Sequence, residues 1–190
     1  MAKCKACKIQ FKPSYSKLQS VCSPKCAIEY ASIQLKKESA KKWKEEKKER
    51  KEKLLTTSDW LQLLQQVFNA YIRERDYKLP CISCGTTANV QYHAGHFYTV
   101  GAYPNLRFDE DNVHKQCGNN CNRKLHGNVL AYREGLIQRI GEERFLSLES
   151  RKQTELKLTL PEIKEFIQKY RKMTKELEQI RKSTVSTAWS

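Results

Sequence analysis

The residues of this chain that could do chemistry are its cysteines and the histidines that lie among the last of them. All eight cysteines fall into close pairs, namely Cys4 with Cys7, Cys22 with Cys26, Cys81 with Cys84, and Cys117 with Cys121. Two thiolates on a tight turn can bind one Zn²⁺ ion at about 2.3 Å, and a second turn completes the tetrahedron. The spacing predicts two structural zinc sites, one from the first four cysteines and one from the last four. Inert buried thiols or a redox disulfide are the alternative, which the regular pairing disfavours.

The composition indicates a protein of the reducing cell interior that binds a polyanion. Thirty-six lysines and arginines face twenty-one acidic residues, which leaves a net charge of +15 along 190 residues. Such a surplus favours nucleic acid as the partner, with an anionic membrane surface as the weaker alternative. No stretch approaches the ~18 consecutive apolar residues of a membrane span, and the N-terminus lacks the apolar run of a secretion signal. We expect a soluble cytoplasmic protein with no membrane partner and no small-molecule substrate.

The elements that must position these residues are mostly helical. Residues 4 to 26 can form only a small zinc knuckle, because so short a stretch cannot bury a core without metal. Residues 35 to 53 contain ten basic and five acidic residues and no glycine or proline. This pattern indicates an exposed helix or semi-rigid linker, which could be a solvated spacer or a DNA contact.

The most regular helix is predicted over residues 58 to 76, where apolar residues form one stripe and Thr57 or Ser58 can cap the first turn. Periodicity predicts further helices over residues 129 to 140 and over residues 160 to 180. A short helix that runs through residue 148 is predicted between them. The expected segments are an N-terminal zinc knuckle (1–30), a charged basic helix or linker (31–56), a zinc-stabilised core (57–150), and a C-terminal amphipathic helix and tail (151–190).

Between Cys84 and Cys117 the sequence predicts two short strands joined by a loop. NVQYHAGHFYTV alternates apolar and polar residues, and NLRFDEDNVHKQC contains a turn at residues 109 to 112. A cysteine turn commonly leads into a helix, so the residues after Cys121 are expected in a first helical turn, where backbone N–H groups favour phosphate. These residues are Asn122, Arg123, Lys124 and His126.

This arrangement resembles the zinc-clamped ββα-metal fold of HNH endonucleases. The shared pattern is a CxxC pair, a histidine, an Asn-Val dipeptide, a second cysteine pair, and then Asn and Lys. The stretches AYIRERDYKLPCISCGT, AGHFYT, LRFDEDNVHKQC and YREGLIQRIG are similar to the NinG (Rap) family of lambdoid phages, recombination endonucleases that act on branched DNA. The resemblance covers nearly the whole chain and is strongest from Asn69 to Gly141.

Placed on this sequence, the resemblance implies catalytic roles for His96, Asn112 and Asn122. In HNH enzymes the histidine at the end of the first strand is the general base, and an unperturbed pKa of ~6.5 suits His96 to this task. Asn112 would hydrogen-bond backbone across the loop. Asn122 would bind a catalytic Mg²⁺ or Mn²⁺ ion, because hard cations prefer oxygen ligands.

Two features depart from the HNH pattern. Many HNH enzymes place an Asp or His immediately before the base as a metal ligand, whereas Gly95 stands there in this chain. The nearest candidate ligand is His93, and a bend in the strand would have to bring it to the same side as His96. Asp109 and Asp111 are the alternative candidates for this metal ligand. The second departure is the spacing CGNNC, one residue longer than CxxC, which affects the placement of Asn122.

Basic side chains near this constellation and along residues 36 to 53 are the predicted DNA contacts. They are Arg107, Lys115, Arg123, Lys124 and His126 in the first group, and Lys41, Lys44 and Lys48 in the second. His114 is interpreted as a structural histidine rather than a further ligand. Four aromatic residues are interpreted as packing residues, and stacking on unpaired bases is the minor alternative. They are Tyr92, Phe97, Tyr98 and Phe108.

Together these inferences predict an α+β fold, mostly helical, with a small zinc-clamped ββα-metal (HNH, treble-clef-like) core and an N-terminal zinc knuckle. The resemblance implies a metal-dependent endonuclease for Holliday junctions and displacement loops, encoded by a phage and active in its bacterial host. Two opposed nicks would require a homodimer, with the apolar faces of residues 58 to 76 and 160 to 180 as contacts. The competing interpretations are a non-catalytic zinc-finger DNA-binding accessory protein and an RNA-binding or annealing factor.

Overall fold

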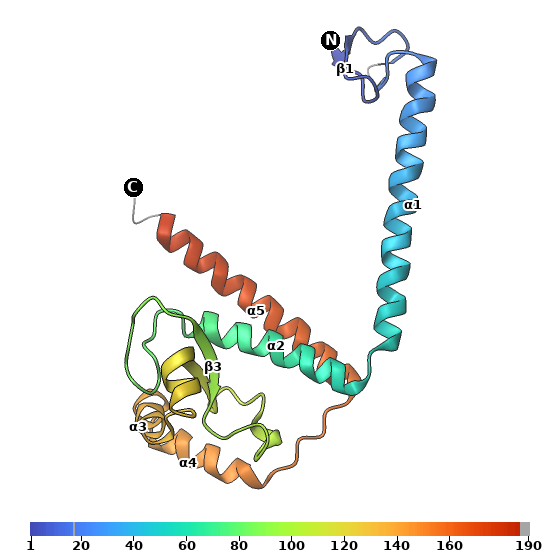
Figure 1. Cartoon of the computed structure of the whole chain (residues 1–190). Coiled ribbons are helices and arrows are strands. Elements are labelled where there is room, and N and C mark those ends of the chain that lie inside the picture. Colours follow the sequence, from blue (N-terminus) through green and yellow to red (C-terminus); the bar gives the residue numbers. More distant parts are fainter. Residues whose placement is uncertain (17, 187–190) are drawn as a thin grey trace. The chain divides into compact units, whose positions relative to one another are not determined.

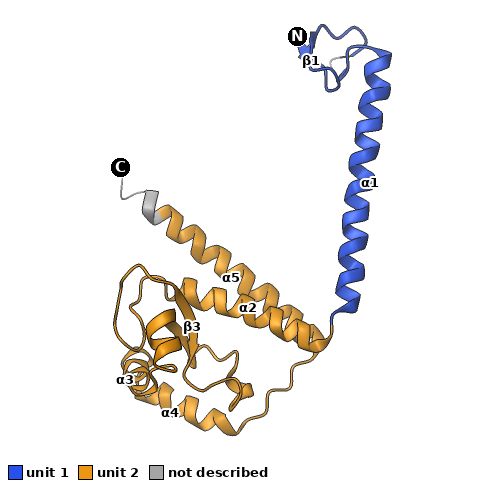
Figure 2. Ribbon diagram, viewed as in Figure 1, with its two compact units in different colours: residues 1–55 blue, residues 56–190 orange. Residues whose placement is uncertain are grey.

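The chain divides into two compact units, Met1–Leu55 and Thr56–Ser190 (Figure 2). The computed structural model describes residues 1–16 and 18–186. The sequence suggested four segments, but the last helix shares a core with the zinc-bearing segment and therefore belongs to the same unit. Among the described residues, no helix combines the length and the apolar character needed to cross a membrane.

The first unit is a small knuckle followed by one long helix. It comprises β1 (Ala2–Lys3), which pairs antiparallel with β2 (Gln10–Phe11), and α1 (Pro24–Leu54). The side chain of Ser23 caps α1 by accepting a hydrogen bond from Cys26 N at 3.2 Å, and Pro24 occupies the first turn, where no N–H is needed. Cys26 is the one buried residue of α1. The rest of the helix is solvated and depends on charge pairs such as Glu46 with Arg50.

The second unit combines five short elements with four α-helices. These are α2 (Thr57–Arg75), β3 (Tyr92–His96), η1 (Pro104–Leu106), β4 (Val113–Cys117), the π-helix η2 (Gly118–Lys124), α3 (Val129–Ile140), α4 (Glu142–Ser150), η3 (Arg151–Gln153) and α5 (Leu160–Ser186). The cap of α2 is Thr56, one residue before the predicted caps. Its hydroxyl accepts from Asp59 N at 3.2 Å, and Asp59 Oδ2 accepts from Thr56 N at 2.8 Å. Thr57 and Ser58 could not form this capping box, because the residues three positions after them are apolar.

Helices α2 and α5 lie side by side (Figure 1), and their apolar stripes form most of the main core of the second unit. The core residues that the two helices contribute are Trp60, Leu64, Phe68, Tyr71, Ile72, Ile163, Ile167 and Tyr170. Full burial of an apolar side chain of this size stabilises a fold by about 1.5–3 kcal/mol. These are the faces that were expected to contact a second copy of the chain, and they are not available for that because each covers the other.

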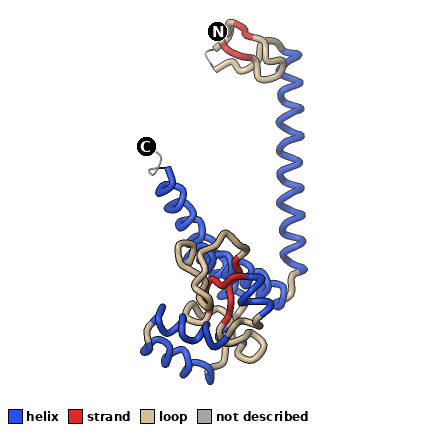
Figure 3. The backbone as a smooth tube through the Cα atoms, turned by 60° about the vertical axis from the view of Figure 1, so that its left-hand side comes forward, coloured by secondary structure: helices blue, strands red, loops and turns tan. Residues whose placement is uncertain are grey.

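Strands β3 and β4 form a regular antiparallel hairpin (Figure 3), as predicted. A second core lies between the turn that begins at Cys81 and helices α3 and α4. Its buried residues are Ile82, Leu106, Tyr132, Leu136, Phe145 and Leu148. Gly135 allows α3 to touch that turn, since a Cβ added to it would lie 1.9 Å from the carbonyl oxygen of Ile82. The helices expected around residues 129 to 148 are present, and Gly141 separates them.

The helix after β4 begins earlier than the sequence suggested. It starts at Gly118, so Cys121 lies inside it and Asn122 to Lys124 form its last turn. His126 follows in a left-handed conformation with φ of 46°. The prediction of a phosphate site at a helix N-terminus is therefore wrong, because the carbonyl end of a helix favours cations over anions. Phosphate contacts here must come from side chains.

Candidate functional site

Both cysteine groups converge as a zinc site requires. Within each group the four Sγ atoms lie within 4.8 Å of one another. A tetrahedral ion with Zn–S bonds of about 2.3 Å places its ligands about 3.8 Å apart. The observed Sγ–Sγ distances include 3.6 Å for Cys7 and Cys22, 3.5 Å for Cys22 and Cys26, and 3.7 Å for Cys84 and Cys117. Both groups could therefore hold zinc, the first at the start of α1 and the second across β4 and η2.

Backbone N–H groups stabilise one thiolate in each group. Burial raises the pKa of Cys81, but the N–H groups of Cys84, Cys117 and Ser83 outweigh it and lower the pKa to about 7. In the same way burial raises the pKa of Cys4, while neighbouring N–H groups, that of Cys22 foremost, lower it to about 6. Metal ligands must be deprotonated, so each group contains a thiol already disposed to ionise near neutral pH.

Asn112 braces the loop between the two strands. The side chain is fully buried, and its Oδ1 accepts a hydrogen bond from Tyr98 N at 2.7 Å. Its Nδ2 donates to the carbonyl oxygens of Tyr98 and Leu106, both at 3.0 Å. The hydrogen bonds to backbone that were expected of Asn112 are present. Because the side chain is fully buried and bonds to backbone, Asn112 holds the loop that follows His96.

His96 ends β3 and lies beside that loop, half-buried. Its Nε2 is 3.1 Å from the carbonyl oxygen of Arg107. A carbonyl can only accept, so Nε2 carries the proton and Nδ1 keeps a lone pair. Burial lowers the pKa of His96 below the ordinary 6.5, and this effect outweighs the hydrogen bonds to the backbone of Arg107 and Ala94, which raise it. The imidazole is therefore neutral at cellular pH, the form that can accept a proton.

His93 and His96 point to opposite faces of the hairpin. The strands pair residue for residue, His93 with Gln116 and His96 with Val113, so the bend that would unite the two histidines is absent. His93 instead lies over the start of η2, where a Cβ added to Gly118 would be 2.9 Å from its Nε2. The face of His93 is thus the face that η2 covers.

Asn122 lies on this same face and is positioned by Gln116, a residue that the sequence did not single out. Gln116 is 1% exposed, and its Nε2 donates to Ser83 Oγ at 2.7 Å and to Gly127 O at 2.6 Å. This fixes its Oε1 as the acceptor for Asn122 Nδ2 at 3.1 Å. Gly95 makes room for the amide, since a Cβ there would lie 2.5 Å from Oε1. A buried glutamine diagonal to a glycine across the hairpin is a cross-strand relation that no local pattern signals.

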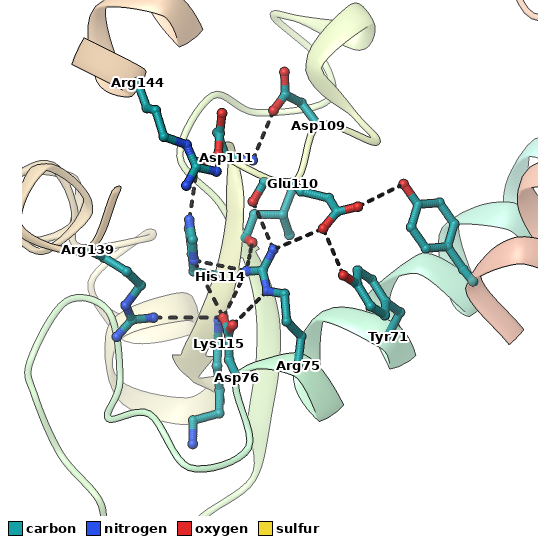
Figure 4. A network of polar contacts seen from close by, with 12 residues as sticks. Tyr71, Arg75, Asp76, Asp109, Glu110, Asp111, His114, Lys115, Arg139 and Arg144 are labelled. Atoms are coloured by element: carbon teal, nitrogen blue, oxygen red, sulfur yellow. Dashed lines mark hydrogen bonds and ion pairs between the residues drawn. The ribbon is translucent and has the colours of Figure 1, made fainter. Parts of the chain in front are cut away.

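A buried ionic network joins β4 to α2 (Figure 4). Arg75 Nε donates to Asp76 Oδ1 at 2.7 Å, and Arg75 Nη2 donates to the carbonyl oxygen of Val113 at 2.9 Å. Asp76 Oδ2 accepts from Lys115 N at 2.9 Å. Burial raises the pKa of Asp76, but its polar neighbours outweigh this effect and hold the pKa far below its usual range. Charge and hydrogen bonding therefore fix β4, the strand that ends at Cys117.

His114 belongs to this network, as its structural interpretation required. Its Nδ1 lies 3.0 Å from Arg75 Nη2, and a guanidinium only donates, so Nδ1 accepts. The proton on Nε2 then points to Asp111 O at 3.2 Å. The substitute metal ligands Asp109 and Asp111 form ion pairs with Arg151, at 2.8 and 3.1 Å.

The prediction that Lys115 contacts DNA is wrong. Lys115 is 7% exposed, and its Nζ donates to Tyr77 O at 2.9 Å and lies 4.5 Å from the centre of the Tyr92 ring. The burial arises because the turn after α2 covers β4, which the sequence around Lys115 does not indicate. This lysine is a structural residue.

The other predicted DNA contacts remain accessible. Arg107 is partly exposed, although its Nε donates to Gln65 Oε1 at 2.5 Å. The exposed basic residues are Arg123, Lys124 and His126 after β4, and Lys41, Lys44 and Lys48 on α1. The aromatic residues of the constellation pack against protein: Phe97 and Tyr98 on the second core, Phe108 on the first, and Tyr92 on the second cysteine group.

Comparisons with known proteins agree in one family. Residues 1–180 match the family model described as Bacteriophage Lambda NinG protein. The chain is 40% identical to Protein ninG of Escherichia phage 933W over 193 residues, which covers 94% of each chain. It is 39% identical to Protein ninG of Escherichia phage lambda, covering 92% of this chain and 91% of that relative. It is 43% identical to Protein ninG of Salmonella phage P22, covering 71% and 72%. No solved structure matches the chain. The chain belongs to the NinG family of bacteriophage proteins.

Proposed function

We propose that this chain is a metal-dependent endonuclease of the HNH type that cuts branched DNA such as Holliday junctions and displacement loops. The observation that supports this most is His96, a neutral imidazole oriented by the Arg107 carbonyl beside the loop that Asn112 braces. A general base requires this free and oriented ring nitrogen. The preference for branched substrates rests on the family resemblance alone.

In this proposal His96 acts on the water that attacks the phosphodiester. Nδ1 takes a proton from the water as its oxygen bonds to phosphorus, and the bond from phosphorus to the 3′ oxygen breaks. The step needs a neutral imidazole, and burial keeps His96 in that form at cellular pH. General-base catalysis of this kind typically contributes ~10²–10⁴-fold to the rate.

Asn122 would hold the catalytic Mg²⁺ or Mn²⁺ ion. Its Nδ2 is engaged by Gln116, which leaves the neutral Oδ1 for a hard cation that keeps several of its waters. His93 lies on the same face but offers a nitrogen, which suits softer ions better. When bound, the ion supplies charge that stabilises the leaving oxygen.

The two cysteine groups are proposed to be structural zinc sites. The second group ties the Cys81 turn to β4 and η2, so it fixes both the strand that pairs with His96 and the helix that contains Asn122. Elemental analysis should find two zinc ions per chain, and Cys121→Ser should reduce this to one and unfold the second unit. A purified chain with well under two zinc ions would contradict the assignment.

DNA binding is proposed to involve α1 as well as the exposed residues after β4. Lys41, Lys44 and Lys48 are all exposed and lie on a helix whose other residues beyond Cys26 are not buried. Replacing the three lysines by glutamine should lower the slope of log affinity against log salt by up to about 0.9 for each phosphate that the chain no longer neutralises. An unchanged slope would make α1 a spacer.

Catalysis is tested by nicking assays on a four-way junction and on a linear duplex of the same sequence, with Mg²⁺, Mn²⁺ or excess chelator. His96→Ala should lower junction cleavage at least ~10²-fold. Zinc content, urea unfolding and junction affinity should remain near wild type, because the His96 side chain lies half-buried at the end of β3 and contributes no ligand to either cysteine group. Asn122→Ala should instead raise the metal concentration needed for half-maximal cleavage.

Gly101→Ala provides the matched control, since nothing lies within 4 Å of the added Cβ. Cleavage by His96→Ala at the wild-type rate would mean that another group is the base. If neither the wild-type chain nor any variant cuts DNA with any metal, a different function is favoured.

That second candidate is a non-catalytic zinc-dependent DNA-binding protein. It is favoured by the placement of His96 and Asn122 on opposite faces of the hairpin. Junction affinity without cleavage would support this candidate.

Opposed cuts in a four-way junction require two active sites, so we propose that two copies act together. The contact must lie outside the faces of α2 and α5 that pack together within one chain. Sedimentation that finds only monomer on junction DNA would contradict this.

A further inference from the structure

The first unit has a surplus of positive charge far beyond its share of the chain. Residues 1–28 contain six lysines and no acidic residue, and residues 1–55 contain sixteen basic residues against six acidic ones. This surplus of ten accounts for most of the +15 of the whole chain. A tetrahedral zinc site with four thiolates adds a charge of −2, which leaves the knuckle basic. The described lysines of residues 1–28 are all exposed.

The knuckle presents several large apolar side chains to solvent, and two of them lie close together in the sequence. Tyr15 is 93% exposed and Leu18 is 91% exposed. They belong to the knuckle tip, which we define as residues 14–16, 18 and 19. The exposure of Tyr15 places an aromatic ring in reach of a partner.

The side chain of Gln19 makes most of the side-chain hydrogen bonds that hold the knuckle tip in shape. Gln19 Oε1 accepts hydrogen bonds from Ser14 N at 2.9 Å and from Tyr15 N at 3.2 Å. Gln19 Nε2 donates to Val21 O at 2.9 Å, which anchors the amide next to the pair of Cys22 and Cys26. The backbone of Tyr15 is thus fixed while its ring is free, so little backbone freedom is lost when a ligand binds the ring.

An exposed aromatic ring on a basic unit fits a specific class of ligand. Lysines attract the phosphate backbone, and a free aromatic face stacks on a nucleic-acid base. The faces of bases in a duplex are covered by their neighbours, whereas those of an unpaired strand are accessible. An acidic protein surface would also satisfy the lysines, but its carboxylates offer the ring no aromatic face to stack on.

We propose that the knuckle tip is a binding site for unpaired DNA, in which Tyr15 stacks on a base and the surrounding lysines contact phosphates. This site is independent of the proposed cleavage chemistry, because it lies wholly in the first unit. It would give the chain affinity for the single-stranded part of a branched molecule.

The test uses the full zinc-loaded chain with His96→Ala, without divalent cation, so that cleavage plays no part. Fluorescence anisotropy at 150 mM salt measures affinity for a 12-nucleotide thymidine strand and for a 12-base-pair duplex. Tyr15→Ala should weaken binding of the single strand by roughly 5- to 100-fold, the range typical of one stacked base. Tyr15→Phe should bind as the parent chain does. Tyr77→Ala is the control, a half-exposed tyrosine of the second unit.

Two further measurements separate stacking from a loss of fold. A strand with 5-iododeoxyuridine should crosslink to Tyr15 under long-wavelength light, as identified by mass spectrometry. Gln19→Ala should weaken single-strand binding while leaving two zinc ions per chain. The proposal is overturned if Tyr15→Ala binds the single strand as tightly as the parent, if it weakens duplex binding equally, or if the crosslink maps elsewhere. None of these outcomes depends on whether the wild-type chain cuts DNA.

Discussion

Replacing Gly95 by alanine tests the arrangement that positions Asn122. The backbone of Gly95 is outside the left-handed region. Alanine is therefore not strained there and by itself would gain about 0.4–1 kcal/mol through a less flexible unfolded chain. The added methyl group, however, would lie 2.5 Å from Gln116 Oε1 and 3.0 Å from Gln116 Cβ. These distances are well inside van der Waals contact, so the amide must move.

The displaced amide would lose its hydrogen bonds to Ser83, Gly127 and Asn122. At about 0.5–1.5 kcal/mol each, the loss of three bonds is about 1.5–4.5 kcal/mol. Subtracting the gain of alanine leaves a net destabilisation of about 0.5–4 kcal/mol. Because Asn122 would lose the partner that orients it, the Mg²⁺ or Mn²⁺ concentration for half-maximal cleavage should also rise.

Urea unfolding of the zinc-loaded chain measures the first effect. Trp43 and Trp189 are changed to phenylalanine, so that the buried Trp60 alone reports on the second unit. With an m value of about 1–3 kcal/mol/M, the midpoint should fall by about 1 M. Gly101→Ala, which meets no atom within 4 Å, should leave the midpoint unchanged.

A double variant makes the reasoning refutable. Gln116→Ala removes the group with which the new methyl collides, so Gly95→Ala with Gln116→Ala should be less destabilised than the sum of the single changes. Strictly additive effects would refute the placement of the amide against Gly95. An unfolding midpoint of Gly95→Ala equal to that of Gly101→Ala would do the same.

Three further predictions follow from contacts in the second unit. Gly135→Ala should destabilise it by more than about 2 kcal/mol, despite a gain in helix propensity of ~1 kcal/mol, because its Cβ would lie 1.9 Å from Ile82 O; an unchanged urea midpoint would contradict this. Asp76→Asn should cost about 3 kcal/mol near neutral pH, because Arg75 loses its carboxylate partner. Since the pKa of Asp76 is lowered, the difference in unfolding free energy between wild type and variant should be full above pH ~4 and should shrink as the pH falls below that value. A difference that stays constant down to pH 2 would contradict this. Burial lowers the pKa of His96, so wild-type cleavage should rise with pH through a midpoint below 6.5 and then level off; a midpoint above 7 would exclude His96 as the base.

Local patterns in the sequence were sufficient to predict most of the elements and both cysteine groups. Apolar residues at helical spacing placed α2, α3 and α5, since a helix repeats every 3.6 residues whatever it packs against. The cysteine spacing indicated which thiols would converge, because tight turns bring the two members of a pair together. The loop asparagine at position 112 was also correctly expected to bond backbone.

Only the tertiary structure decided what lies opposite each side chain. The apolar faces of α2 and α5 looked like dimer contacts because periodicity marks a face as apolar without naming its partner, and that partner is within the chain. Lys115 looked like a DNA contact because charge is visible in the sequence, whereas the turn that buries it is contributed by Tyr77, 38 residues earlier. Gln116 positions Asn122 through a cross-strand space that Gly95 leaves open. Burial and the partners of a side chain depend on segments far apart in the sequence, and these meet only when the chain folds.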